Sequence, residues 1–149
     1  MNVKSWVLIS VFLLSATLCE ETRARSEREW LKLLGEERYA IMRKEGTEHA
    51  HINQYANKWG DGIYACAGCA SPLFEGKDKY NAKNGYPSFS KPIDKKNVYY
   101  EEDRTFGFKR YEVLCRCCHS HLGHVFNDGP EPKGLRYCIN SIALIFTSD

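Results

Sequence analysis

Two pairs of cysteines in this sequence have the spacing of a metal site. Cys66 and Cys69 are separated by two residues, and Cys115 and Cys118 repeat that spacing. A tight turn lets two such thiolates point at one ion, and four thiolates complete the tetrahedron that structural zinc prefers. We therefore predict one structural zinc ion per chain, with disulfides among these cysteines as the alternative. Cys117, inside the second pair, is predicted to be a spare thiol.

A zinc ion with four thiolate ligands has no open position for a substrate, so any reaction must use other residues. Cys138 has no cysteine partner at a two-residue spacing. In a strand, period-two alternation places Arg136, Cys138 and Asn140 on one face. We expect the nearby guanidinium to lower the pKa of the Cys138 thiol and so to favour the nucleophilic thiolate. A buried, inert cysteine is the alternative.

Two histidines follow the second cysteine pair. His121 and His124 flank a predicted turn at Gly123, and an imidazole, whose pKa is near neutrality, suits proton donation. Metal ligation and a place in the core are the alternatives, although four thiolates already fill the zinc site. His119 is predicted to be a solvated turn residue.

An aromatic segment precedes these motifs. Asn84-Gly85 is a typical turn dipeptide, and Pro87 restricts the backbone after it. Tyr86 and Phe89 are candidates to line an apolar pocket for a methyl group. Packing of these rings in the core is the alternative.

Short helices and then strands must position these side chains. Ser26 and Glu29 fit a capping box, and the helical spacing after them is interrupted at Gly35 and ends near Gly46. Beyond Gly60, short runs rich in β-branched and aromatic residues alternate with turn signals. The most strand-like segments are residues 98–101, 106–114, 124–126 and 136–146. We predict a mainly β fold of antiparallel strands with short N-terminal helices.

Composition limits the class of protein further. The chain has 149 residues, of which 43% are hydrophobic and 27% are charged, as expected for one folded domain. Its formal net charge is only +2, and it contains no long run of basic residues. Nucleic acid is therefore not an expected partner.

The first residues have the pattern of a secretory signal peptide. Lys4 precedes an apolar run over residues 6–18, and charged residues begin at Glu20. We predict a signal peptide over residues 1–19 and a mature domain over residues 20–149, with an uncleaved anchor as the alternative. Removal of residues 1–19 would leave a protein of the endoplasmic reticulum lumen or a secreted one, with no membrane contact.

Six short motifs occur in register along most of the chain. They are Cys66-Ala67-Gly68-Cys69, Gly85-Tyr86-Pro87-Ser88-Phe89, Cys115 to Cys118, His121-Leu122-Gly123-His124-Val125-Phe126, Asp128-Gly129-Pro130 and Arg136-Tyr137-Cys138-Ile139-Asn140-Ser141. In type and order these motifs closely resemble those of the B-type methionine sulfoxide reductases. The resemblance runs from about Glu27 to Phe146.

The resemblance implies two antiparallel sheets of three or four strands, N-terminal helices and a four-cysteine zinc. It also implies repair of oxidised proteins by reduction of the R epimer of methionine sulfoxide, with thioredoxin or glutaredoxin as electron donor. By position, Cys138 matches the family's nucleophile, which becomes a sulfenic acid. His121, His124, Arg136 and Asn140 match residues around it, and His124 is expected to protonate the departing oxygen with help from His121.

The sequence departs from the family pattern at two positions. Tyr86 replaces the usual tryptophan, which puts substrate affinity in doubt. Asn84 occupies the position where many members carry a resolving cysteine, so resolution falls to Cys117 or, as we expect, to an external thiol. Two other functions remain open: a zinc-stabilised binding module without catalysis, and a disulfide-stapled extracellular domain.

Overall fold

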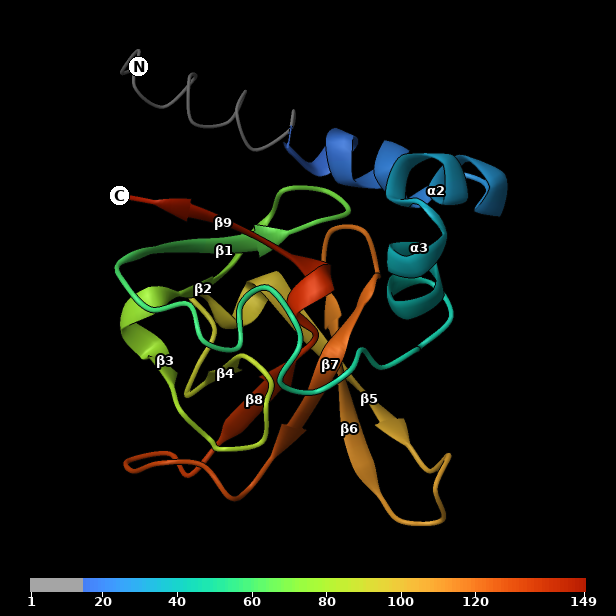
Figure 1. Cartoon of the computed structure of the whole chain (residues 1–149). Coiled ribbons are helices and arrows are strands. Elements are labelled where there is room, and N and C mark those ends of the chain that lie inside the picture. The colour runs from blue at the N-terminus through green and yellow to red at the C-terminus, as the bar shows by residue number, and fades with distance from the viewer. Residues whose placement is uncertain (1–14) are drawn as a thin grey trace, which may run out of the picture.

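The computed structural model describes residues 15–149, and two short helices lead into its strands (Figure 1). Helices α2 (Glu27–Leu34) and α3 (Glu36–Met42) are separated by Gly35, which has a positive φ of 76°. The predicted capping box is present, because the Ser26 side chain accepts from the Glu29 backbone and the Glu29 carboxylate accepts from Ser26 N. Both interactions satisfy amide groups that the first helical turn leaves unpaired.

The strands form two antiparallel sheets, as predicted. A three-stranded sheet has the order β2-β1-β9, and a six-stranded sheet has the order β3-β4-β8-β7-β6-β5. The strands are β1 (Gly62–Cys66), β2 (Pro72–Glu75), β3 (Lys79–Tyr80), β4 (Ser88–Phe89), β5 (Val98–Asp103), β6 (Arg110–Cys115), β7 (His121–Phe126), β8 (Arg136–Ile139) and β9 (Leu144–Ser148). The larger sheet therefore exceeds the three or four strands that the family resemblance implied.

Two predicted strands have different limits in the structure. The segment 136–146 is not one strand, because a 3-10 turn, η3 (Ser141–Ala143), ends β8 and carries the chain into β9 of the other sheet. The segment 106–114 begins as a hairpin turn, and β6 starts only at Arg110. Both runs are rich in β-forming residues, and Gly107 is the one turn-forming glycine inside them.

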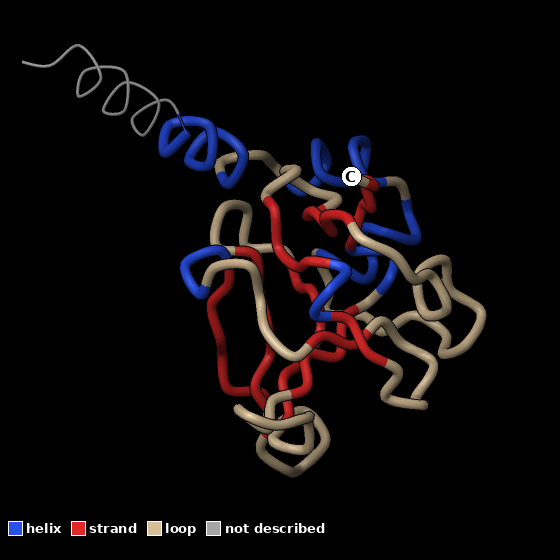
Figure 2. The backbone as a smooth tube through the Cα atoms, turned by 90° about the vertical axis from the view of Figure 1, so that its left-hand side faces the viewer, coloured by secondary structure: helices blue, strands red, loops and turns tan. Residues whose placement is uncertain are grey.

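The core lies between the two sheets and the helices. Its fully buried members include Trp30 of α2, Tyr64 of β1, Phe74 of β2 and Leu122 of β7. In Figure 2 the N-terminal helices lie at one end of the molecule, and loops cluster at the opposite end. In Figure 1 that opposite end carries the β5–β6 and β7–β8 loops, whereas the β6–β7 turn lies near the helices. The long β6–β7 hairpin thus connects the two ends.

A disulfide joins the N-terminal segment to the β6–β7 turn. Residues 15–23 are helical, and Cys19 forms a disulfide with Cys117, their Cα atoms 4.8 Å apart. Cys117 is therefore not the spare thiol that we predicted. A chain cleaved after Cys19 would lack this disulfide, while residues 1–14, most of the predicted signal peptide, lie outside the described residues. Within residues 15–149, none of the helices has both the length and the apolar character needed to cross a membrane.

Candidate active site and zinc centre

The four paired cysteines converge on one point between the sheets. Sγ atoms of Cys66, Cys69, Cys115 and Cys118 all lie within 4.8 Å of one another. Two of the separations, Cys66 to Cys118 and Cys69 to Cys115, are 3.6 Å. In a tetrahedron with Zn–S bonds of about 2.3 Å, the sulfurs would be about 3.8 Å apart. The cluster therefore fits a structural zinc ion, and the alternative of disulfides among these four cysteines is wrong.

The two halves of the zinc centre have the same backbone geometry. In each, the amide four residues after the first cysteine donates to that cysteine's carbonyl: Ala70 N to Cys66 O at 2.8 Å, and His119 N to Cys115 O at 2.9 Å. Ala70 and His119 both have a positive φ, near 60°. One half follows β1 and the other joins β6 to β7, so the metal connects the two sheets.

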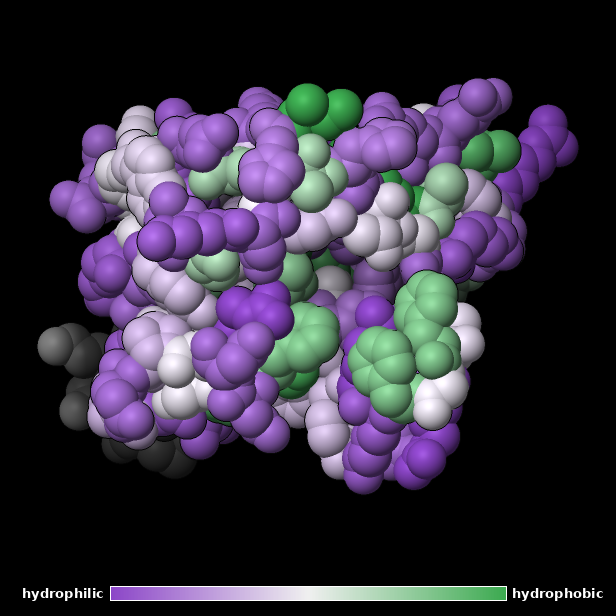
Figure 3. Space-filling view, turned by 60° about the horizontal axis from the view of Figure 1, so that its bottom comes forward, coloured by the Kyte–Doolittle hydropathy of each residue, from purple (hydrophilic) through white to green (hydrophobic). Residues whose placement is uncertain are grey.

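A cavity of about 300 Å³ lies away from the metal, and Cys138 lines it. Its walls come from the loop before the sheets, the aromatic segment, β6, β7 and β8. The lining residues are Thr47, Asn84, Tyr86, Arg110, Gly123, His124, Phe126, Arg136, Cys138, Ile139 and Asn140. Figure 3 shows a hollow with hydrophobic side chains beside it on the face that carries the loop end of the molecule. The cavity has the mixture of apolar wall and few polar groups expected of a small-ligand site.

The alternation predicted for β8 holds at this cavity. Arg136 and Cys138 point to it, while Tyr137 and Ile139 are buried on the opposite side of the strand. Ile139 also touches the cavity edge. A Cβ on Gly123 would overlap the carbonyl oxygen of Cys138, so the glycine permits the close approach of β7 to the nucleophile's strand.

The Cys138 thiol is less acidic than the sequence suggested. Burial raises its pKa above the ordinary cysteine value, and the Arg136 charge and an Asn84 hydrogen bond oppose this effect only in part. The guanidinium of Arg136 is shared with Asp128, to which its Nε and Nη2 donate at 2.8 and 3.0 Å. Because Asp128 shares the guanidinium, the effect of burial on the pKa prevails, and the site favours the protonated thiol over the thiolate.

The side-chain amide of Asn84 donates a hydrogen bond to the Cys138 sulfur. Its Nδ2 donates to Cys138 Sγ at 3.7 Å, and its Oδ1 accepts from Tyr86 N at 3.1 Å. The second bond fixes the orientation of the amide, so a donor points at the sulfur. Asn84 therefore stabilises negative charge on Cys138.

A β-bulge brings the two histidines together. Three positions apart in a regular strand, they would face opposite sides of the sheet. The register of β6 and β7 shifts between Val113 and Leu114, so that Val113 pairs with Gly123 and Leu114 with His121. This irregularity resets the alternation, and the two imidazole rings lie 5.5 Å apart. The predicted glycine turn between the histidines is thus a bulged strand.

Each imidazole is bound to a carboxylate. His121 Nδ1 lies 2.6 Å from Glu112 Oε1, and His124 Nε2 lies 2.8 Å from Asp103 Oδ2. Burial lowers the pKa of His124, and the Asp103 carboxylate opposes that effect in part. His121 is buried behind the cavity, with its Nε2 unpaired among the described residues. His124 lines the cavity itself, so it is the imidazole that reaches a ligand.

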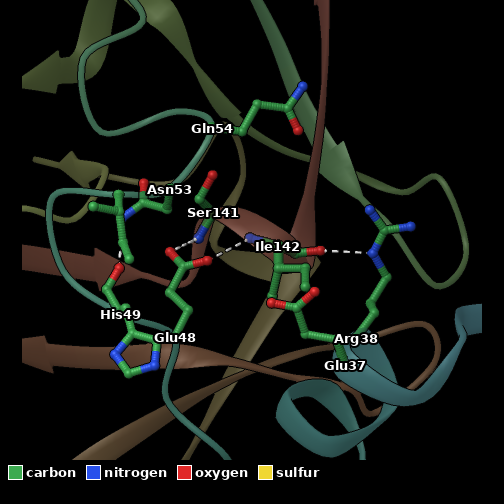
Figure 4. A pocket seen from close by; sticks show the side chains of 9 residues that line it. Glu37, Arg38, Glu48, His49, Asn53, Gln54, Ser141 and Ile142 are labelled. Carbon is green, nitrogen blue, oxygen red and sulfur yellow. Dashed lines mark hydrogen bonds between the residues drawn. The ribbon is translucent and has the colours of Figure 1, made fainter.

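The chain just after Cys138 is fixed by the loop that contains Glu48. The Glu48 carboxylate accepts from the backbone amides of Ser141 and Ile142 (Figure 4). Glu48 N also donates to Asn140 Oδ1 at 3.1 Å. Tyr86 Oη donates to the Glu48 carbonyl at 3.0 Å. Asn140 and the Tyr86 hydroxyl are therefore used in holding this loop against the cavity.

Comparisons with known proteins identify the family. A model of the SelR domain matches residues 34–148. The chain belongs to the SelR domain family. It is 47% identical over 126 residues to the peptide methionine sulfoxide reductase MsrB of Methanosarcina mazei, covering 84% of this chain and 89% of that protein. The MsrB of Acinetobacter baylyi is 45% identical over 125 residues (84% and 90%), and that of Alteromonas mediterranea 43% over 124 residues (83% and 87%).

Phe89, a predicted pocket residue of this SelR domain, lies in the core instead of at the cavity. Phe89 is fully buried, its ring stacked on Phe74 at 4.5 Å and in edge contact with Tyr64 at 5.1 Å, and it does not line the cavity. Phe89 and Tyr86 are three positions apart, which in extended chain places them on opposite sides. Tyr86 is at the cavity, as predicted.

Several site residues of the SelR domain were missed by sequence analysis. They are Thr47, Asn84, Asp103, Arg110, Glu112 and Phe126, together with Asp128 as the partner of Arg136. An acidic residue opposite a histidine on a neighbouring strand indicates an imidazole–carboxylate pair, but this can be recognised only when the strand register is known. The sequence gives no register across β5, β6 and β7.

Proposed function

We propose that this protein reduces methionine R-sulfoxide in proteins back to methionine, with Cys138 as the nucleophile. The observation that carries the proposal is the geometry of one cavity: Cys138 is in its wall, Asn84 donates to the sulfur, and His124 is bound to Asp103 beside it. The names of the SelR relatives support the same reaction. An apolar wall that includes Phe126 and Tyr86 suits the methyl group of the thioether.

The reaction transfers one oxygen atom and two electrons. Cys138 attacks the sulfoxide sulfur as a thiolate and forms a sulfur–sulfur bond, while the protonated oxygen leaves as water. Water then attacks the Cys138 sulfur and breaks that bond, which releases methionine, returns a proton and leaves Cys138 as a sulfenic acid. The methionine sulfur is reduced by two electrons and the cysteine sulfur is oxidised by two. Because burial favours the protonated thiol, a proton must leave the sulfur before or during the attack. His124 is the cavity group that can take up and return a proton.

The carboxylate partners keep the imidazoles oriented. With Nε2 of His124 donating to Asp103, the other ring nitrogen is left to exchange protons with the reacting oxygen. The Glu112 carboxylate fixes His121 in the same way. His121 then acts behind His124, in ring contact with it, which fits the assisting role expected for it.

The sulfenic acid is resolved by an external thiol. Among residues 15–149, which contain all seven cysteines, four cysteines form the zinc cluster and two form the Cys19–Cys117 disulfide. Cys117 has no free thiol in this state, so it cannot attack Cys138. An external thiol forms a mixed disulfide with Cys138 and releases water, and a second thiol then restores Cys138. Thioredoxin or glutaredoxin would supply both.

The protein belongs, in this proposal, to the secretory pathway, in the endoplasmic reticulum lumen or outside the cell. The apolar N-terminal run and the disulfide both support this location, since disulfides persist in oxidising compartments. The disulfide also favours signal cleavage upstream of Cys19, after a small residue such as Ala16. The mature chain would then retain all seven cysteines.

The epimers of blocked methionine sulfoxide test the activity. With dithiothreitol as reductant, we expect consumption of the R epimer and at least about a hundredfold slower consumption of the S epimer, because the cavity positions oxygen and methyl group differently for the two. Chromatographic separation of sulfoxide and thioether measures both rates. Binding of the R epimer without turnover would instead support a binding module, and equal rates for the epimers would contradict the proposal.

Replacing Asp103 with asparagine should slow turnover by about a hundredfold. The substitution removes the carboxylate that orients His124 and raises its pKa, so that pKa should fall further below its ordinary value. If His124 donates its proton as an imidazolium, activity decreases as pH rises through this pKa, and the variant should lose activity at lower pH. Profiles of kcat/KM against pH with the blocked R-sulfoxide measure this shift.

Glu102→Gln is the matched control, because Glu102 is the exposed neighbour that pairs with Arg104 and Lys109 instead. It should keep the wild-type rate and profile. A fully active Asp103→Asn enzyme with an unchanged profile would rule out His124 as the proton donor.

A further inference from the structure

Two phenylalanine rings project from the turn that joins β5 to β6. Phe106 is 68% exposed and Phe108 is 57% exposed. The turn is closed by a hydrogen bond from Gly107 N to Arg104 O at 2.9 Å, and Gly107 supplies a positive φ of 81°. Adjacent exposed aromatic rings on a turn cost solubility and are typical of a contact surface. We call this pair the aromatic tip.

Arg110 connects the aromatic tip to the cavity. Its guanidinium carbon lies 4.7 Å from the centre of the Phe106 ring and 5.6 Å from that of Phe108. The same side chain lines the cavity and donates to Asp103, the partner of His124. The aromatic tip is therefore one side chain away from the proposed reaction site.

The cavity has a second aromatic wall. Phe126 lines it, with the Arg136 guanidinium 4.3 Å from the ring centre. In Figure 3, hydrophobic side chains gather on both sides of the hollow on this face. When a polypeptide places one residue in the cavity, the residues that flank it would therefore contact apolar surface.

We infer that the aromatic tip binds an apolar side chain that flanks the methionine sulfoxide in an unfolded substrate polypeptide. This inference depends on the proposed function, because the cavity must hold the oxidised residue. An extended chain advances about 3.3 Å per residue. The two rings stack against a guanidinium that itself lines the cavity, so a residue about two positions from the sulfoxide can reach them. The aromatic tip makes the protein select oxidised methionine in apolar sequences that folding normally buries.

Two peptides and two variants test this inference. One peptide carries methionine R-sulfoxide with phenylalanine two residues before and after it, and the matched peptide has serine at both positions. We expect the wild-type protein to reduce the phenylalanine peptide with a kcat/KM about tenfold higher. The double variant Phe106→Gln/Phe108→Gln should lose this preference while it reduces the blocked amino acid at the wild-type rate.

Leu33→Gln is the matched control, since Leu33 is 54% exposed on α2 and does not line the cavity. It should retain the tenfold preference. No preference in the wild-type protein, or equal losses on peptides and blocked amino acid in the double variant, would overturn the inference.

Peptide binding separates this inference from the proposed function. Fluorescence anisotropy with the Cys138→Ser protein measures affinity without turnover, and the phenylalanine peptide should bind about tenfold more tightly than the serine peptide. If the wild-type protein reduces neither peptide nor the blocked amino acid, the proposed function fails. The aromatic tip would still be supported by a binding preference that Phe106→Gln/Phe108→Gln removes, and it would be overturned by equal binding of the two peptides.

Discussion

Replacing Cys138 with serine is expected to abolish reduction of methionine R-sulfoxide, with a loss of at least about a thousandfold. A serine hydroxyl in the same place is far less acidic and far less nucleophilic than a thiol, and it cannot form a sulfenic acid. Consumption of the blocked R-sulfoxide in dithiothreitol measures the loss. Mass spectrometry of the wild-type protein, treated with substrate in the absence of reductant, should show one added oxygen on the peptide that contains Cys138.

Cys117→Ser is the control for this variant. It removes a cysteine and opens the Cys19–Cys117 disulfide but leaves the cavity intact. We expect it to keep dithiothreitol-driven turnover close to that of the wild-type protein. Continued turnover by the Cys138→Ser protein would show that Cys138 is not the nucleophile. A Cys117→Ser protein that stalls only when thioredoxin is the reductant would show that Cys117 is the resolving thiol.

The environment of Cys138 decides how this reaction begins. The sequence-based expectation was a pKa lowered by Arg136, but burial raises the pKa of Cys138, and the guanidinium, shared with Asp128, opposes this only in part. Because the thiolate is the reactive form, a raised pKa lowers the reactivity of the resting cysteine. Asn84 then supplies a hydrogen bond that favours the charged sulfur at the moment of attack.

The sequence predicted those parts of the molecule that depend on local spacing. The zinc ligands, the capping box at Ser26 and the alternation of Arg136 and Cys138 all follow from the geometry of a turn, a helix end or a strand. These features need no knowledge of which strands are neighbours. The sequence thus predicted the zinc ligands and the wall of the cavity that β8 forms.

The parts that sequence did not predict depend on strand pairing. The bulge opposite Val113 places both imidazoles on one side, and nothing in the residue types of β6 indicates it. Asp103 reaches His124 only because β5 and β7 both flank β6. The Cys19–Cys117 disulfide joins residues 98 positions apart, so its pairing is set by the fold and not by spacing.

Removing the zinc is expected to unfold the domain as well as to end activity. Binding of a structural zinc ion contributes about 10 kcal/mol or more to the folded state, which is comparable to the total stability of most domains at about 5–15 kcal/mol. Here the metal joins β1 of the three-stranded sheet to the β6–β7 turn of the six-stranded sheet. Core residues between the sheets, such as Tyr64 and Leu122, are fully buried, and we expect them to be exposed when that connection is lost.

The measurement is elemental analysis together with thermal unfolding by circular dichroism, before and after treatment with a strong chelator. We expect one zinc per chain, cooperative unfolding of the metal-loaded protein, and loss of the β-sheet signal when the metal is removed. Cys19→Ser/Cys117→Ser is the matched control, because it also removes two cysteines close to the zinc centre yet leaves all four ligands. This control should keep its zinc and most of its thermal stability. If the chelated protein stays folded and active, the packing between the sheets alone holds Cys138 and His124 in place, and the metal is dispensable for the site.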